Sequence, residues 1–370
     1  MNRGTRQFRW LWNGATLFLC VAAASSAPVW GTEPAHRAEW MASGSYGVMT
    51  HYLISPQGAT PEEKTAAFNR TVDAFDVEFF LKQFADSRAD WLIFTIGQNT
   101  GYYSSPNAYL DRVLPGHTSR RDLIQELAQR VHKLGKRFIA YLPAEVAGQA
   151  EEVKAAFGWD TPDHREFLRR YLEFVREYSK SLGRVCDGWW FDGCYDPIHK
   201  GRWNWQDWCD AARAGNPDAA IAFNDGSFCI GREKPVSPLQ DYHAGEVHML
   251  EDGKIRFDFM SPAKDVYKNE QGFLRVRGKE PVFYLPTSQY VEGVQWHALV
   301  PIDSSFMAPV IPDQHYEDGD LLRFLTACKN VRGGVTLNVP IDTALGHIPS
   351  ATAAQLARLG EALGNSKKQP

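Results

Sequence analysis

The stretch "VCDGWWFDGCYDP", residues 185–197, joins an apolar run to a carboxylate. The run "GWWF" is typical of a strand that is buried on both faces, yet it ends at Asp192 and Gly193 follows directly. In a barrel of parallel strands, the residues at the carboxyl end of each strand face the mouth where active sites form. The stretch therefore predicts a buried strand that places Asp192 in a pocket. The alternative is an Asp192 that caps the next turn.

Eight apolar runs of this kind occur along the chain, and helical patterns separate several of them. The predicted strands are 46–53, 90–97, 136–143, 186–193, 219–225, 239–246, 281–287 and 334–340. One helical pattern, 119–136, begins at Ser119 and stops at Gly135. This alternation predicts an α/β fold, a (β/α)8 TIM-like barrel rather than an open sheet. We expect a single domain of this kind over residues 40–366.

The first residues have the pattern of an export signal. Three arginines within nine residues precede the short apolar run "ATLFLCVAAA", and the small residues "SSA" follow. We expect a signal peptide over residues 1–27, because the run is too short to span a bilayer. Lipid attachment at Cys20 is a weaker alternative, since Phe18 and Leu19 are bulky. Cleavage would give a secreted or periplasmic protein without stable membrane insertion.

Composition narrows the possible partners. A formal charge of −4 and a pI near 6.3 argue against a nucleic-acid partner, which needs a basic surface. The chain has 12 tryptophans, and residues such as Trp190 could fill the core or form flat platforms for sugar rings. No Cys-x-x-Cys pair or histidine cluster has metal-ligand spacing. We expect an oligosaccharide or glycan as partner, and neither a metal nor a cofactor.

Polar side chains lie at the ends of most predicted strands. Besides Asp192 they include His51, Gln98, Asn99, Glu145, Asn224, Asp225, Asp241, His243, Glu246 and Asn338. In a barrel they would form a polar ring around one mouth. Such a ring suits glycoside hydrolysis, in which retaining enzymes place a carboxylate nucleophile about 5–5.5 Å from a second carboxyl group. The second group must keep its proton near neutral pH.

Over residues 45–363 the order and spacing of the motifs resemble the α-L-fucosidases of glycoside hydrolase family 29. "YGVMTHYL" is similar to the family's first strand and matches His51 to its sugar-binding histidine. "AYLPAEV" matches Glu145 to the glutamate of a Glu-Trp pair. "WWFDG" resembles the nucleophile motif, which makes Asp192 the nucleophile. "TLNVPIDTALGHIP" is similar to the closing signature. The resemblance implies a retaining exo-glycosidase that releases α-L-fucose or a related sugar from glycans.

The chain departs from this family in the residues that grip the sugar. Gln98 and Asn99 stand where the family has paired histidines. Amides donate and accept hydrogen bonds but differ from histidine in charge and reach. A glycosidase for another sugar, such as α-L-galactose, therefore remains an alternative. The chain also ends where many members begin a C-terminal β-sandwich, so we expect the barrel alone.

The general acid/base is the second departure. The family's Trp-Glu pair before the last strand aligns with Trp296 and His297, and Glu292 lies five residues before His297. We predict Glu292 as the acid/base and Trp296 and His297 as substrate-binding residues. His297, Glu246 and Glu251 remain alternatives for the acid/base.

The other candidates have two interpretations each. Glu145 is a substrate ligand or the partner of a basic residue. Asp241, His243 and Glu246 line the mouth and contact substrate, and a metal site there is a much weaker alternative. Because the histidine pair is missing and the acid is uncertain, a second hypothesis for the whole chain is a barrel that binds glycans without cleaving them.

Overall fold

The computed structural model describes residues 36–161, 164–195, 199, 203–225, 235–247, 250–257, 266–268, 274–276, 282–302 and 316–365. The chain divides into a compact unit, His36–Pro370, and Met1–Ala35. The predicted signal peptide, 1–27, therefore lies outside the described residues. Within the described part, no helix is long and apolar enough to cross a membrane.

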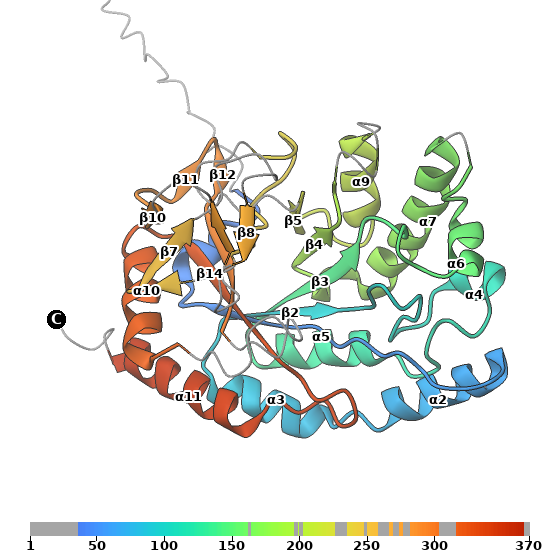
Figure 1. The fold of residues 1–370 in the computed structure, drawn as a ribbon, viewed down its shortest axis with the longest axis horizontal. Coiled ribbons are helices and arrows are strands. Elements are labelled where there is room, and N and C mark those ends of the chain that lie inside the picture. Colours follow the sequence, from blue (N-terminus) through green and yellow to red (C-terminus); the bar gives the residue numbers. More distant parts are fainter. Residues whose placement is uncertain are drawn as a thin grey trace, which may run out of the picture. The chain divides into compact units, whose positions relative to one another are not determined.

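Seven parallel strands form one curved sheet, in the order β13-β14-β1-β2-β3-β4-β5 (Figure 1). They are β1 (Gly47–Thr50), β2 (Trp91–Thr95), β3 (Arg137–Pro143), β4 (Gly188–Asp192), β5 (Ala220–Phe223), β13 (His297–Pro301) and β14 (Gly334–Val339). The first strand, β1, pairs with both β2 and β14, so the chain's last strand lies beside its first. This order is that of a (β/α)8 barrel and confirms the predicted fold class.

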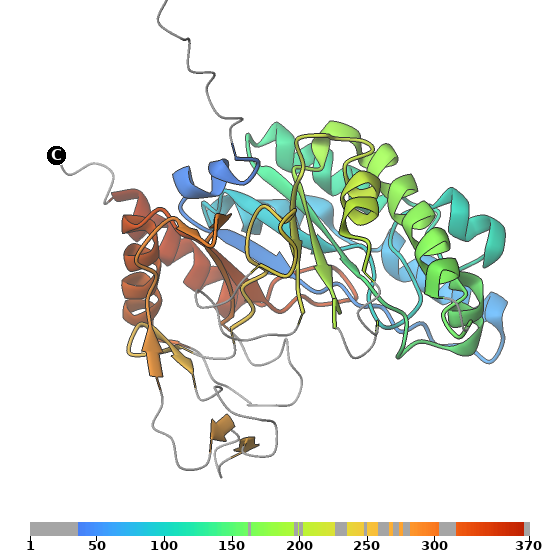
Figure 2. The same ribbon diagram turned by 90° about the horizontal axis from the view of Figure 1, so that it is seen from above.

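Helices cover the outer face of this sheet (Figures 1 and 2). They are α2 (Pro61–Asp73), α3 (Val77–Asp86), α4 (Ala108–Val113), α5 (Leu123–Lys133), α6 (Glu151–Phe157), α7 (His164–Leu182), α9 (Trp205–Ala212), α10 (Asp318–Asn330) and α11 (Ser350–Asn365), with the 3-10 turn η1 (Gly183–Val185). Helix α1 (Glu39–Ser43) instead packs Met41 against the residues inside the barrel. The predicted cap at Ser119 is wrong: α5 is capped by Asp122, whose side chain accepts from the Gln125 backbone N–H at 3.0 Å.

The barrel strands are mostly apolar because both faces of the sheet are covered. One set of alternate residues, including Trp189 and Phe191, packs in the large core with residues of the helices. The other set, including Met49, Ile93 and Trp190, packs in a smaller cluster inside the barrel. This double burial explains why "GWWF" reads as a continuous apolar run.

The sixth barrel position is filled by residues 240–247, between β5 and β13. The Asp241 N–H donates to the Ile221 carbonyl of β5 at 2.8 Å. On the other side, the Val247 N–H donates to the Leu299 carbonyl at 2.9 Å, and Glu246 forms a parallel bridge with Leu299. The segment therefore closes the ring where a strand over 239–246 was predicted, with isolated bridges instead of a regular ladder.

The seventh strand differs from the prediction. Val282–Tyr284, inside the predicted strand 281–287, forms β10 and pairs antiparallel with β7 (Lys254–Phe257) outside the barrel. The seventh barrel strand is instead His297–Pro301, which begins at a residue that was predicted to bind substrate. Both runs are short and apolar, and periodicity cannot tell a barrel strand from a hairpin strand.

Three small sheets accompany the barrel. Figure 2 shows β7 and β10 apart from the parallel sheet and next to α10. Their strands are β6 (Leu250–Glu251), β7 and β10 in one sheet, β8 (Val266–Lys268) and β9 (Leu274–Val276) in a second, and β11 (Tyr290–Val291) and β12 (Val294–Gln295) in a third.

Gly245→Ala tests the closure by residues 240–247. Gly245 has φ +72°, and a Cβ there would lie 2.1 Å from the His297 carbonyl oxygen. Gly135 has a similar φ, +71°, with nothing within 4 Å. We expect Gly135→Ala to cost about 1–2 kcal/mol in unfolding free energy from its backbone alone, and Gly245→Ala to cost at least twice as much. Denaturant unfolding of both variants measures this, and equal losses would contradict the close contact.

Candidate active site

A cavity of about 270 Å³ opens at the carboxyl end of the barrel strands. Its lining residues come from seven of the eight barrel positions, with β5 the exception. They are His51, Leu53, Gln98, Asn99, Tyr141, Trp190, Asp192, Glu246, Val247, Leu299, Pro301 and Asn338. Five of the predicted site residues therefore meet here with Asp192: His51, Gln98, Asn99, Trp190 and Glu246. Among the residues that the structure describes, no lysine or arginine lines the cavity.

Asp192 receives four hydrogen bonds. Its Oδ2 accepts from Gln98 Nε2 at 2.9 Å and from the Tyr141 hydroxyl at 2.5 Å. Its Oδ1 accepts from the Gly193 backbone N–H at 2.9 Å and from Asn224 Nδ2 at 2.8 Å. All four donors favour the ionised carboxylate over the protonated form. Asp192 is thus a fixed, oriented carboxylate and no mere turn cap.

Strand register brings Tyr141 to this carboxylate. Tyr141 of β3 pairs with Trp190 of β4, and their rings stack at 5.1 Å with 13° between the planes. Trp190 is held by a hydrogen bond from its indole N–H to the Ala244 carbonyl at 3.1 Å. Gly193 then turns the chain at φ +73°, where a Cβ would lie 2.7 Å from Glu145 Cγ. The residue after Asp192 therefore has room for glycine alone.

Asn224 links Asp192 to a second carboxyl group. The same Nδ2 that contacts Asp192 Oδ1 at 2.8 Å also contacts Glu246 Oε2 at 2.9 Å. Because one nitrogen touches both, these oxygen atoms are separated by no more than 2.8 Å plus 2.9 Å. This limit for the two oxygen atoms is compatible with the carboxyl pair of retaining glycosidases, about 5–5.5 Å apart.

The two carboxyl groups differ in their surroundings. Burial raises the pKa of Asp192, and its four hydrogen bonds oppose that rise. Burial and the nearby charge of Asp192 raise the pKa of Glu246 from 4.5 to about 7, with a single opposing bond from Asn224. Unequal donors thus separate the pair into a carboxylate at Asp192 and an acid at Glu246 near neutral pH.

Gln98 joins His51 to the same network. Since Gln98 Nε2 donates to Asp192, its Oε1 is the acceptor for His51 Nδ1 at 3.0 Å. The proton of a neutral His51 therefore lies on Nδ1, which makes Nε2 the acceptor. Burial lowers the pKa of His51, so the ring stays neutral. Asn99 lines the cavity from an exposed position with φ +58°.

Glu145 lies next to the pair but outside the cavity lining. It is half-buried, it packs against Gly193, and its side chain accepts from the Ala147 backbone N–H. Burial is the main cause that raises its pKa, with a contribution from the charge of Asp192. Its carboxylate is thus bonded to the loop after β3, and its predicted role as a substrate ligand stays a prediction.

Asp241 and His243 line no part of the cavity. Asp241 forms an ion pair with Arg213 at 2.5 Å and accepts from the Ile221 N–H at 2.9 Å, so it ties the sixth position to β5. His243 Nε2 donates to the Val291 carbonyl at 3.2 Å. Both were predicted as substrate-binding residues because they belong to the predicted strand 239–246, but the residues of this segment that reach the cavity are Glu246 and Val247 at its end.

Trp296 and His297 also lie away from the cavity. His297 begins β13, while Pro301 at the other end lines the cavity, about 13 Å along an extended chain. Both nitrogens of His297 have partners, the His243 carbonyl at 2.9 Å and Thr336 Oγ1 at 2.8 Å. Burial lowers the pKa of His297 to about 4. Trp296 is fully buried and packs near Tyr284.

Glu292 and Glu251, two of the acid/base candidates, are exposed. Glu292 lies in the turn between β11 and β12, with φ +51°. Glu251 ends β6. Neither lines the cavity that contains Asp192. The alignment pointed to the stretch around 292–297 because it precedes the last strand, but that stretch forms a hairpin and the base of β13.

Sequence reasoning did not single out Tyr141 or the apolar lining residues Leu53, Val247, Leu299 and Pro301. The sequence contained a signal for Tyr141, because it lies two residues before the end of the predicted strand 136–143. Its side chain is therefore on the same face as that of the last residue. From sequence, Asn224 was only one of the polar residues at the strand ends, and its double contact with Asp192 and Glu246 depends on three-dimensional placement.

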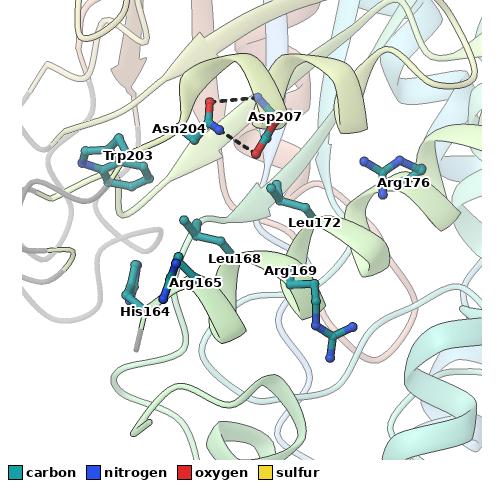
Figure 3. A pocket seen from close by; sticks show the side chains of 9 residues that line it. All are labelled: His164, Arg165, Leu168, Arg169, Leu172, Arg176, Trp203, Asn204 and Asp207. Carbon is teal, nitrogen blue, oxygen red and sulfur yellow. Dashed lines mark hydrogen bonds between the residues drawn. The ribbon is translucent and has the colours of Figure 1, made fainter. Parts of the chain in front are cut away.

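A second hollow, of about 820 Å³, lies between α7 and α9 (Figure 3). Trp203 and three arginines are among its lining residues. Arg169 forms two hydrogen bonds with Glu166, and Asp207 is bound by Asn204 Nδ2 at 2.6 Å. The hollow contains no carboxyl pair, so we regard the barrel cavity as the candidate active site. Elsewhere in the described part, no three His, Cys, Asp or Glu side chains form a metal site.

No protein-family profile and no curated protein matches this sequence. Solved structures do match its fold. The endo-fucoidan hydrolase MfFcnA4 of glycoside hydrolase family 107 superposes with a TM-score of 0.60 at 17% identity, over 88% of this chain and 53% of the hydrolase. This chain thus spans about half of that protein. The α-L-fucosidase isoenzyme 1 of Paenibacillus thiaminolyticus gives 0.59 at 16% identity, over 89% and 75%.

A third similar structure is the α-L-fucosidase AlfC of Lactobacillus casei, with a TM-score of 0.55 at 15% identity, over 90% of this chain and 99% of AlfC. At these identities the similarity concerns the fold. The chain therefore has the same type of barrel as α-L-fucosidases and family 107 fucoidan hydrolases, and a carboxyl pair at the mouth of that barrel.

Proposed function

We propose that this protein is an exported, retaining exo-glycosidase that releases α-L-fucose or a related sugar from glycans. The observation that carries the proposal is the single amide of Asn224, which contacts both Asp192 and Glu246 at the mouth of a barrel. The barrel is shared with fucosidases and fucoidan hydrolases. The export signal rests on the sequence of residues 1–27 alone.

Asp192 is the proposed nucleophile. It attacks the anomeric carbon and forms a glycosyl ester, while Glu246 gives its proton to the leaving oxygen. Water then enters, Glu246 takes a proton from it, and the ester is hydrolysed with net retention. The hydrogen bonds from Gln98, Tyr141 and Asn224 hold Asp192 in one orientation for the attack.

The acid/base role passes from Glu292 to Glu246 in this proposal. Glu292 is exposed and outside the cavity, whereas Glu246 lines it beside Asp192. A pKa of about 7 lets Glu246 act as an acid in the first step and as a base in the second. His297 is excluded from the role because both of its ring nitrogens are bonded at the base of β13.

Cavity size supports action on a single terminal sugar. At about 270 Å³ the hollow is slightly smaller than typical pockets for drug-sized ligands, about 300–1,000 Å³. It therefore fits one sugar ring. Trp190 and Tyr141 supply aromatic surface, and His51 and Asn99 supply groups that can bind hydroxyls.

Asp192→Gly tests the nucleophile. We expect the turnover of 4-nitrophenyl α-L-fucoside, or of another aryl glycoside that the wild type cleaves, to fall at least about 10³-fold, because the ester cannot form. Azide, a small nucleophile that fits the space left by the side chain, should restore cleavage and give a glycosyl azide of inverted configuration by NMR. Wild-type rates in Asp192→Gly would reject the assignment.

Glu246→Gln and Glu292→Gln form a matched pair for the acid. We expect kcat/KM of the wild type to fall as pH rises through about 7, because Glu246 loses its proton there. Glu246→Gln should lose this alkaline limb and lose more activity on natural glycosides than on aryl glycosides with good leaving groups. Glu292→Gln should keep the wild-type profile. The reverse pattern would return the acid/base role to Glu292.

The same proton affects stability. The pKa of Glu246 is about 7 in the folded protein against an ordinary 4.5, so its proton stabilises the fold below pH 4.5 and this contribution is lost as pH rises through 7. Glu246→Gln cannot ionise. In denaturant unfolding we expect the free energy of unfolding of Glu246→Gln to exceed that of the wild type by roughly 1–3 kcal/mol at pH 8, with no such gain at pH 4. A gain of equal size at both pH values would contradict the raised pKa.

A further inference from the structure

Asn338 is a buried amide in the cavity wall that has no role in the mechanism proposed above. It lies in β14, one residue before the strand ends, and 1% of its surface is exposed. Its side chain lines the cavity, and Oδ1 has no hydrogen-bond partner among the described residues. A buried amide oxygen without a donor is unfavourable, because it has lost water and gained no bond in exchange.

The neighbours of Asn338 in the wall are apolar. Leu299 and Pro301 belong to β13, the strand that pairs with β14. Leu53 follows β1, the strand on the other side, and Val247 is hydrogen-bonded to Leu299. These side chains offer no donor. A half-turn about the last torsion of Asn338 presents either its oxygen or its nitrogen to the cavity.

Topology places Asn338 across the mouth from Asp192. In the ring of eight positions, β14 is separated from β4 by three positions in either direction. A sugar with its anomeric carbon at Asp192 extends toward β14. The ring atom opposite the anomeric carbon of a pyranose is C4, so the substituents on the far edge, at C3, C4 and C5, are those that face Asn338.

We propose that Asn338 is a specificity-determining residue that hydrogen-bonds one hydroxyl on the far edge of the sugar, at C3, C4 or C6. The inference rests on the proposed glycosidase function and adds the substrate feature that the cavity selects. A sugar that carries this hydroxyl forms a hydrogen bond with the Asn338 amide. A sugar that has hydrogen in its place leaves the buried amide without a partner. Sites of this kind discriminate strongly, because the unpaired group loses its partner completely.

Asn338→Leu with a set of matched substrates tests this. The substrates are the 4-nitrophenyl α-L-galactoside, the α-L-fucoside, which lacks the 6-hydroxyl, and the 3-deoxy and 4-deoxy forms of the better of the two. We expect one hydroxyl deletion to lower kcat/KM of the wild type by roughly 10–1,000-fold, and the same deletion to matter less than threefold in Asn338→Leu. Asn330→Leu, an exposed asparagine at the end of α10, should keep the wild-type ratios.

Thermal unfolding separates this role from a structural one. Leucine branches at Cγ as asparagine does, and its larger side chain can extend into the cavity; because it removes the unpaired oxygen, Asn338→Leu should keep or raise Tm. A Tm lowered by several degrees would mean that the amide is paired in the free protein and would overturn the inference. Equal substrate ratios in wild type and Asn338→Leu would also overturn it.

Failure of the proposed function gives a different result. If the wild type cleaves none of these glycosides, calorimetric binding of L-fucose, L-galactose and their 3-deoxy and 4-deoxy forms still decides the role of Asn338. If the wild type binds a sugar more tightly than its deoxy form, and Asn338→Leu binds the two equally, the inference holds for a barrel that binds glycans without cleaving them. Absence of binding, or an unchanged preference, overturns it.

Discussion

The candidate site depends on where one amide is held. The backbone of Asn224 is bonded to the chain just before and just after Asp192. Its N–H donates to the Phe191 carbonyl at 2.8 Å, and its carbonyl accepts from the Cys194 N–H at 2.8 Å. With the backbone held in this way, the side-chain nitrogen of Asn224 lies between the two carboxyl groups. Because Asn224 follows β5 and Asp192 ends β4, the pairing of two parallel strands sets the chemistry of the mouth.

Charge balance follows from the same arrangement. Among the described residues, the cavity lining has two part-buried acids and no basic side chain, and the hydrogen bonds that these acids receive come from neutral donors. Asp192 takes four of these donors and Glu246 shares one. If Glu246 also ionised, few hydrogen bonds would stabilise its negative charge. The proton therefore stays on Glu246, the group with fewer donors. The two carboxyl groups therefore differ in protonation because they receive different numbers of hydrogen bonds, and the positions of Asn224 and Tyr141 determine these numbers.

Sequence reasoning predicted the barrel, the strand that ends at Asp192, and the presence of His51, Gln98, Asn99 and Glu246 near it. These depend on local patterns: an apolar run, its end, and the rule that parallel strands share one functional edge. It failed for the seventh strand and for Glu292, because alignment by order along the chain cannot show which of two short apolar runs enters the ring. The double contact of Asn224 and the isolation of Asn338 depend on distances between strands, which no local pattern contains.

The irregular sixth position, residues 240–247, has a consequence for how such a barrel can change. A regular strand fixes every side chain by its alternation, so moving one catalytic group moves its neighbours. The segment that carries Glu246 is joined to β5 and β13 by scattered bridges, and Gly245 relieves it of that alternation. Insertions there can reposition Glu246, the proposed proton donor, while the strand that ends at Asp192, the proposed nucleophile, stays intact. One barrel can thereby adapt to leaving groups of different shape by remodelling a single wall.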